Sequence, residues 1–111
     1  MNFINFSIKD YDVSDFNISP EYKFQDKKSK VYIFGDLIGA IFEKKLFSSE
    51  ESFDKIVKKI NKSDFNGFVS TTIGQYYLVI IQNNNVKILC SPSSPSLFYT
   101  FENGIYIFSN D

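Results

Sequence analysis

The C-terminal half of the chain is a succession of short β-type segments, and this pattern constrains the fold more than any other feature. After residue 67 the sequence reads FVSTTI, QYYLVII, NVKILC, SLFYTF and IYIFSN, with QNNN and ENG among the connections. Asn103-Gly104 is a strong hairpin signal, because both residues adopt positive φ readily. Short strands joined by tight turns predict an antiparallel meander over this part of the chain.

The middle of the chain favours two helices. In SSEESFDKIVKKINK, Ser48 and Glu51 have the spacing of a capping box. The apolar stripe of that helix consists of Phe53, Ile56, Val57 and Ile60. The segment DLIGAIFEKKLF, residues 36–47, also places apolar residues on one helical face. Asp36 at its start and lysines near its end suit a helix dipole, so we expect a first helix there.

The N-terminal third is less regular. Residues 2–8 alternate apolar and polar positions and predict a strand. Residues 9–29 are mixed and charged, which indicates an irregular segment that can carry a short edge strand. The run KVYIFGD, residues 30–36, predicts a buried strand that enters a turn at its glycine. The expected fold class is α+β, a single domain over residues 1–111 with antiparallel sheets and two central helices.

Composition excludes several chemistries. The chain has no histidine, its 12 basic residues are all lysine, and it has one cysteine. Ser-His and Cys-His activation are therefore excluded within this chain, as are arginine clamps, histidine zinc sites and internal disulfides. A net charge of −1 gives no field that favours nucleic acid or an anionic membrane. The chain lacks both an apolar segment long enough to span a membrane and a signal peptide, so we expect a cytoplasmic protein. Because the chain has no histidine and one cysteine, we predict no metal site.

Two positions are candidates for chemistry, and each has a structural alternative. Cys90 ends a predicted strand, and Lys87, three residues earlier, points to the opposite face. Because no cation lowers its pKa, we interpret Cys90 as structural or incidental. Gly35, in FGD, can present backbone N–H groups to an anion ahead of a helix. Glycine at such a turn also serves conformation alone.

The order of these segments resembles the N-terminal domain of the asparagine synthetase family. FGD stands at the family's Asn-Gly-Glu, GQYYLVII at its Gly-x-Phe-Ala strand, SPSSPSLFY at its Arg-Asp-x-x-Gly-x-x-Pro-Leu-Tyr-Tyr turn, and GIYIFSND at its Ser-Ser-Glu strand. The resemblance covers roughly residues 30–111. It implies an amidotransferase-like core after an N-terminal strand and irregular segment over residues 1–29. The implied fold is a truncated sandwich like that of N-terminal-nucleophile (Ntn) hydrolases.

In that family the domain is a class II glutamine amidotransferase, and this chain departs from its active-site pattern. Asn2 stands where the family has its nucleophilic cysteine, and Phe34 replaces the oxyanion-hole Asn. The arginine that holds the glutamine carboxylate is absent from the chain. The resemblance implies no catalytic residue here, and it leaves Gly35 and Asp36 as a vestigial ligand-binding pair. Glutamine hydrolysis is therefore not expected.

Two functions remain open from the sequence. The resemblance implies a non-catalytic scaffold or docking unit for an ATP-dependent, amide-forming synthetase domain, in cis or in trans. The chain is similar in this to the degenerate, disarmed version of the domain in β-lactam synthetases and lasso-peptide cyclases. ATP and magnesium would belong to the synthetase domain, and the present chain would hold no cofactor. The alternative is a stand-alone domain that binds a peptide or protein through an exposed sheet edge. The sequence also suggests either a fragment of a longer chain or a free-standing remnant.

Overall fold

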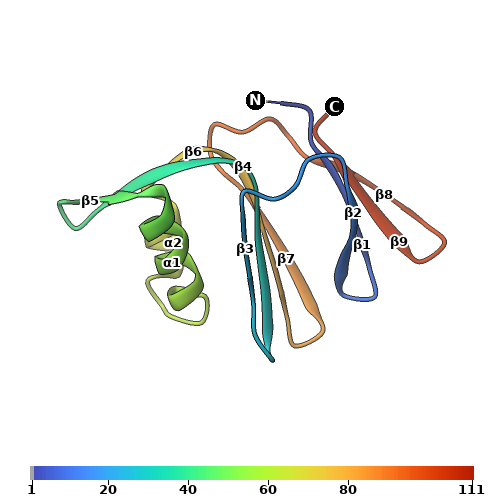
Figure 1. Ribbon diagram of the computed structural model, residues 1–111, viewed down its shortest axis with the longest axis horizontal. Helices are drawn as coiled ribbons and strands as arrows, with labels where there is room; N and C mark the ends of the chain where they lie inside the picture. The colour runs from blue at the N-terminus through green and yellow to red at the C-terminus, as the bar shows by residue number, and fades with distance from the viewer. Residues whose placement is uncertain (1) are drawn as a thin grey trace.

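The computed structural model describes residues 2–111, which form two antiparallel sheets and two helices (Figure 1). Sheet A has the order β2-β1-β9-β8 and contains β1 (Asn5–Lys9), β2 (Asp12–Phe16), β8 (Phe98–Glu102) and β9 (Ile105–Ser109). Sheet B has the order β3-β4-β6-β7, with β5 also paired to β4. Its strands are β3 (Tyr22–Gln25), β4 (Ser29–Phe42), β5 (Lys45–Ser48), β6 (Thr72–Gln82) and β7 (Asn85–Cys90). The helices are α1 (Ser49–Lys59) and α2 (Phe65–Val69). The predicted α+β class is confirmed.

Both ends of the chain contribute to sheet A. The strand β1 pairs with β9 from Asn5↔Ser109 to Lys9↔Ile105, so the two termini lie side by side (Figure 1). The strand β3 pairs with β4 in sheet B. The segment over residues 2–29 therefore contributes strands to both sheets.

The helix expected over residues 36–47 is wrong. β4 continues through this segment to Phe42, turns at Glu43 and Lys44, whose φ values are 50° and 65°, and returns as β5. The cause is a register irregularity between Leu37 and Gly39. The predicted helical stripe of Leu37, Ile38, Ile41 and Phe42 is divided in the structure. Leu37 and Phe42 face the core beneath the helices, whereas Ile38 and Ile41 are exposed.

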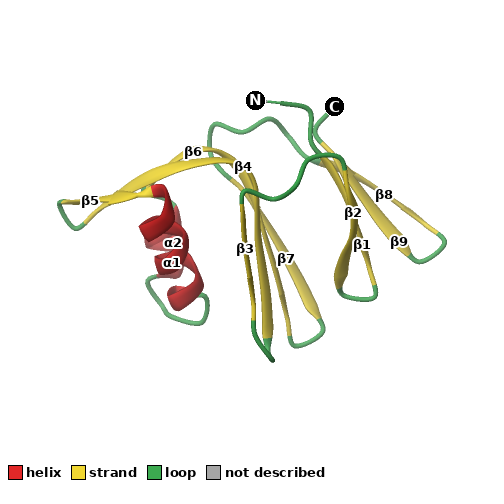
Figure 2. Cartoon of the chain, viewed as in Figure 1, coloured by secondary structure: helices red, strands yellow, loops and turns green. Residues whose placement is uncertain are grey.

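Three further expectations can be compared with the structure (Figure 2). Residues 9–29 contain β2 and β3, two whole strands where the sequence suggested at most one. The capping box is confirmed, because the Ser48 hydroxyl accepts the Glu51 N–H and the Glu51 carboxylate accepts the Ser48 N–H, each at 3.2 Å. The hairpin turn is also confirmed, with φ of 52° at Asn103 and 79° at Gly104. A second short helix, α2, which the sequence did not predict, follows α1.

Sheet B has an apolar core on each of its faces. On one face it packs against the helices through Val31, Ile33, Leu37, Ala40, Ile56, Phe65, Phe68, Tyr76, Leu78 and Ile80. On the other it packs against sheet A through Ile4, Phe6, Ile8, Tyr32, Phe34, Tyr77, Val79 and Ile81. Because β4 and β6 contribute to both cores, they read as nearly continuous apolar runs in the sequence.

Candidate functional site

An aromatic row crosses sheet A from the core to its edge. Cross-strand partners share a face of a sheet, and the register pairs Phe6 with Phe108, Phe108 with Tyr99, and Tyr106 with Phe101. Phe6 is in the core against sheet B. The side chains of Tyr99, Phe101 and Tyr106 therefore lie on the inner face of sheet A, the face that carries its core.

This inner face is uncovered at β8. Phe6 is 1% exposed, whereas Tyr106, Phe101 and Tyr99 are 44%, 56% and 64% exposed. Sheet A thus extends past the last strand of sheet B. We call these three exposed residues, Tyr99, Phe101 and Tyr106, the aromatic face.

Ring contacts hold the aromatic face in place. Phe6 stacks on Phe34 at 4.6 Å between centroids and on Phe108 at 5.1 Å. Tyr99 lies 5.8 Å from Phe108, and Phe101 lies 4.5 Å from Tyr106. The exposed rings are therefore continuous with the buried core and are positioned by it.

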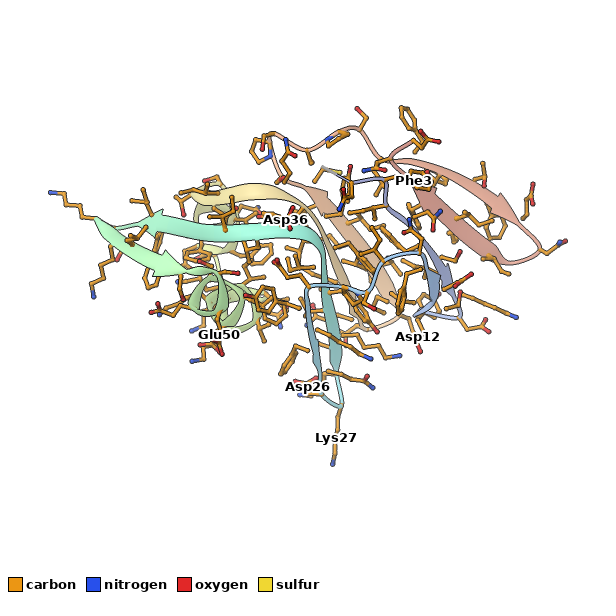
Figure 3. The ribbon with its side chains drawn as sticks, turned by 45° about the horizontal axis from the view of Figure 1, so that its top comes forward. Phe3, Asp12, Asp26, Lys27, Asp36 and Glu50 are labelled. Carbon is orange, nitrogen blue, oxygen red and sulfur yellow. The ribbon has the colours of Figure 1, made fainter. Side chains whose placement is uncertain are left out.

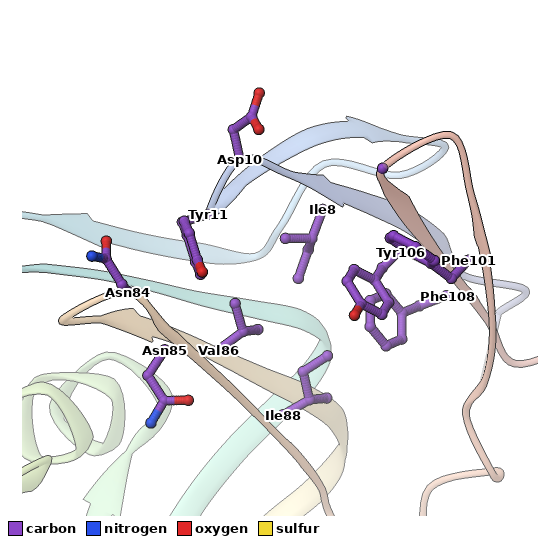
Figure 4. A pocket seen from close by; sticks show the side chains of 11 residues that line it. Ile8, Asp10, Tyr11, Asn84, Asn85, Val86, Ile88, Phe101, Tyr106 and Phe108 are labelled. Atoms are coloured by element: carbon purple, nitrogen blue, oxygen red, sulfur yellow. The ribbon is translucent and has the colours of Figure 1, made fainter.

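A cleft of about 620 Å³ lies beside the aromatic face, between the two sheets (Figure 4). Phe101, Tyr106 and Phe108 line it from sheet A, and Val86 and Ile88 line it from β7. The rest of the lining comes from β1, the hairpin turns and the start of β7: Ile8, Asp10, Tyr11, Asn84, Asn85 and Gly104. An apolar floor with a polar rim is typical of a binding site.

The edge of β8 differs from the other sheet edges of the described chain. β2 carries Asp12 and Asp15 and pairs through a register irregularity, while β3, β5 and β7 each contain a lysine. Charges and irregularities of this kind discourage pairing with another strand. β8, with the sequence FYTFE, has one charge at its last residue and a regular register with β9. Residues 88–111 contain no lysine at all.

A second uncovered surface lies at the far end of sheet B. There Ile41 pairs with Leu46, and Gly39 pairs with Ile73. These residues lie on the face of sheet B that packs against sheet A, but beyond the end of the core between the two sheets. The exposed side chains that form this aliphatic patch are Ile38, Ile41, Leu46 and Ile73. The patch lies on the arm that β4, β5 and the start of β6 form, which extends away from sheet A (Figure 1).

Gly35 and Asp36, the predicted vestigial pair, are not at a strand-to-helix turn. Gly35 lies within β4 with a φ of 105°, and Asp36 lies on the exposed side of that strand (Figure 3). The Leu37 N–H donates to the Glu21 carboxylate at 3.0 Å. Burial raises the pKa of Glu21, the Leu37 hydrogen bond lowers it, and the charge of Asp36 raises it. A role for Gly35 and Asp36 in ligand binding stays a prediction.

Cys90 lies at the end of β7, opposite Tyr77 and on the face toward sheet A. Burial raises the pKa of its thiol, so the thiol is protonated at neutral pH. Lys87 lies on the other face, with its ammonium 5.3 Å from the centroid of Phe65. This geometry agrees with the interpretation of Cys90 as a residue that is not activated.

Within residues 2–111, no group of three or more Asp, Glu or Cys side chains is arranged to hold a metal ion. None of the helices in that range is long and apolar enough to cross a membrane. Comparison with protein-family models, curated proteins and solved structures gave no significant match. The resemblance to the asparagine synthetase family therefore stays a prediction.

Sequence reasoning missed the aromatic face. Alternation along β8 and β9 shows which aromatic side chains share a face. It does not show whether another layer covers that face. The available signal was the absence of lysine from residues 88–111, combined with a rich supply of aromatic residues.

Proposed function

We propose that this chain is a non-catalytic docking domain that binds a partner protein along β8. In this proposal an extended segment of the partner pairs with the free edge of β8, and its apolar side chains cover the aromatic face. The observation that carries the proposal is the exposure of Tyr99 and Phe101 on the inner face of a sheet whose core residues, such as Phe6, are buried. Exposed apolar surface that adjoins a core marks an interaction site.

Strand addition suits the chemistry of this edge. Main-chain hydrogen bonds supply affinity in that mode, and alternate side chains supply specificity. The regular, nearly uncharged β8 accepts a neighbouring strand without repulsion. The adjacent cleft can receive a side chain of the added segment between Phe101 and Ile88.

The residues of the chain also support the non-catalytic part of the proposal. A nucleophile needs a base or a cation to activate it. The chain has no histidine or arginine, and its one thiol has a raised pKa. We therefore expect no ammonia release when the protein is incubated with glutamine.

The sequence resemblance suggests one class of partner. A synthetase domain of the asparagine synthetase type, in cis or in trans, is large enough to contact both uncovered surfaces. The aliphatic patch favours a second candidate function, that of a scaffold for a synthetase domain. A peptide bound at β8 alone would leave Ile41 and Leu46 exposed. In that assembly ATP and magnesium bind the synthetase and not this chain.

Site-specific photocrosslinking in the source cells tests the proposal. A photoreactive residue is placed at Thr100 in β8, at Leu46 in the aliphatic patch, or at Ser14 in β2, all of them exposed. Ser14 is the matched control, because β2 is the opposite edge of the same sheet. We expect protein adducts at Thr100 and none at Ser14.

The adducts distinguish the candidates. A single defined adduct at Thr100 alone supports docking along β8. Adducts of one protein at both Thr100 and Leu46 support the scaffold. An absence of protein adducts at Thr100, or equal labelling at Ser14, would overturn the proposed docking function.

A further inference from the structure

We infer that the partner at β8 is a second copy of this chain, joined by antiparallel pairing of the two β8 strands around a two-fold axis at Thr100. This inference rests on the proposed docking function, because it names the occupant of the same edge. It follows from the self-complementarity of the strand. The sequence FYTFE presents the same surface in both copies, as a two-fold interface requires.

The register is determined by the faces of the sheet. Tyr99 and Phe101 lie on the inner face of sheet A, and Thr100 pairs with Ile107 on the outer face. Antiparallel partners must share a face, so inner residues of one copy oppose inner residues of the other. Centring the pairing on Thr100 uses all five residues of β8 in both copies. Tyr99 then opposes Phe101 of the second copy, and Phe101 opposes its Tyr99.

The resulting cross-strand pairs are favourable. Two aromatic pairs form on the inner face, and the two Thr100 residues meet on the outer face. Pairs of these kinds stabilise antiparallel sheets. Glu102 opposes the uncharged Phe98, so the two glutamates lie at opposite ends of the interface. In this register no like charges oppose each other, because Glu102 is the one charged residue of β8.

The two-fold axis is perpendicular to the sheet. Rotation about such an axis makes the two β8 strands antiparallel and leaves the inner faces of both copies on the same side. Both copies therefore carry sheet B on the same side of a continuous eight-stranded sheet. The two clefts face each other across the joined aromatic faces. The assembly is closed, since each copy uses its single β8 edge.

The available area indicates a weak dimer. Tyr99, Phe101 and Tyr106 of the aromatic face are 64%, 56% and 44% exposed, and Phe98, on the outer face of β8, is 63% exposed. With about 200 Å² per aromatic side chain, two copies can cover at most about 900 Å² of this surface. That is below the roughly 1,200 Å² of a stable interface, so we expect a dimer that dissociates on dilution.

A charge-swap experiment at Thr100 tests the inference. Wild-type protein and the variants Thr100→Glu and Thr100→Lys are studied by sedimentation equilibrium from about 1 to 500 μM. Each variant places two like charges on the axis, so we expect its dimer dissociation constant to rise about tenfold or more. An equimolar mixture of the two variants pairs opposite charges, so we expect it to dimerise at least as well as the wild type. The controls Ser14→Glu and Ser14→Lys, at the other edge, should dimerise like the wild type.

Three results would overturn the inference. These are a wild type that is monomeric throughout, a dimer that is unaffected by either Thr100 variant, and a mixture that remains monomeric. Circular dichroism of each variant shows that a loss of dimer is not a loss of fold. A monomeric wild type together with a crosslink from Thr100 to a different protein would end the inference and leave the docking function intact. A monomeric wild type without any such crosslink would end both.

Discussion

Ser91 extends the pairing of β6 and β7 by one rung beyond the end of β7, through two hydrogen bonds to Tyr76. Its backbone N–H donates to the Tyr76 carbonyl at 3.0 Å, and its side-chain hydroxyl accepts the Tyr76 N–H at 2.9 Å. Both residues are buried. Ser91 therefore anchors the connection that leaves sheet B and reaches β8 in sheet A.

Replacing Ser91 by alanine should destabilise the fold. The variant Ser91→Ala removes the acceptor of a buried N–H, which costs about 1–3 kcal/mol of unfolding free energy. Urea denaturation measures the change. The exposed Ser96, in the same connection, provides the control, and Ser96→Ala should change stability by less than about 0.5 kcal/mol. Equal stability of the two variants would show that the Ser91 hydroxyl has no structural role.

Gly74 allows the close approach of β6 to the irregular part of β4. Its φ is +138°, and a Cβ there would lie 2.1 Å from the carbonyl oxygen of Asp36. We expect Gly74→Ala to cost at least about 2 kcal/mol, because both strain and a backbone clash result. By contrast, a Cβ added to Gly67 in α2 would meet no atom within 4 Å. Gly67→Ala should instead be neutral or stabilise the protein by up to about 1 kcal/mol. Thermal unfolding of both variants checks this opposite behaviour.

The raised pKa of Tyr32 predicts that the protein loses stability at alkaline pH. Burial first, and then the charge and hydrogen bond of Asp12, raise its pKa from 10.0 to about 12. The unfolded chain therefore loses the tyrosine proton at lower pH than the folded chain. The stability that depends on this proton is complete below about pH 10 and is lost as the pH rises to about 12.

The variant Tyr32→Phe should reduce the slope of unfolding free energy against pH in this window. Part of the slope should remain, because burial also raises the pKa of Tyr76 and Tyr77. Asp12→Asn should lower the pKa of Tyr32 and shift the onset of its titration. An unchanged slope in Tyr32→Phe would contradict the assignment.

The carboxyl groups of Glu21 and Asp36 should be coupled. Burial is the main cause that raises the pKa of Glu21 above 4.5, and Asp36 adds to it. We expect Asp36→Asn to lower the Glu21 pKa, as measured by NMR titration of the side-chain carboxyl. Stability linked to the raised pKa is present below pH 4.5 and is lost as the pH rises through the folded-state value. Asp36→Asn should therefore reduce this loss.

Asp54→Asn on α1 is the control for this coupling. Asp54 forms an exposed ion pair with Lys58 and is not among the groups that shift Glu21. If Asp54→Asn moved the Glu21 pKa as far as Asp36→Asn does, the coupling would be an effect of net charge alone.

Local signals predicted the parts of the fold that depend on neighbouring residues. Ser48 and Glu51 marked the start of α1, and Asn103-Gly104 marked the β8–β9 turn. The irregularity at residues 37–39 could not be predicted in this way, because it depends on the pairing of β4 with β6, a strand distant in the sequence. The aromatic face depends on a relation of longer range still. Because β9 pairs with β1 on one side, β8 on its other side becomes the edge strand of sheet A. This edge extends past sheet B.

The size of the native particle tests docking along β8 most directly, whatever the partner is. Wild type and the double variant Tyr99→Glu/Phe101→Glu are each expressed in the source cells, the cells are treated with a chemical crosslinker so that a weak dimer survives dilution, and the extracts are separated by size exclusion. The account predicts that the wild type elutes in a larger particle and the double variant elutes at the size of one chain. The control Ser14→Glu should elute with the wild type. A double variant that elutes with the wild type would contradict docking through the aromatic face.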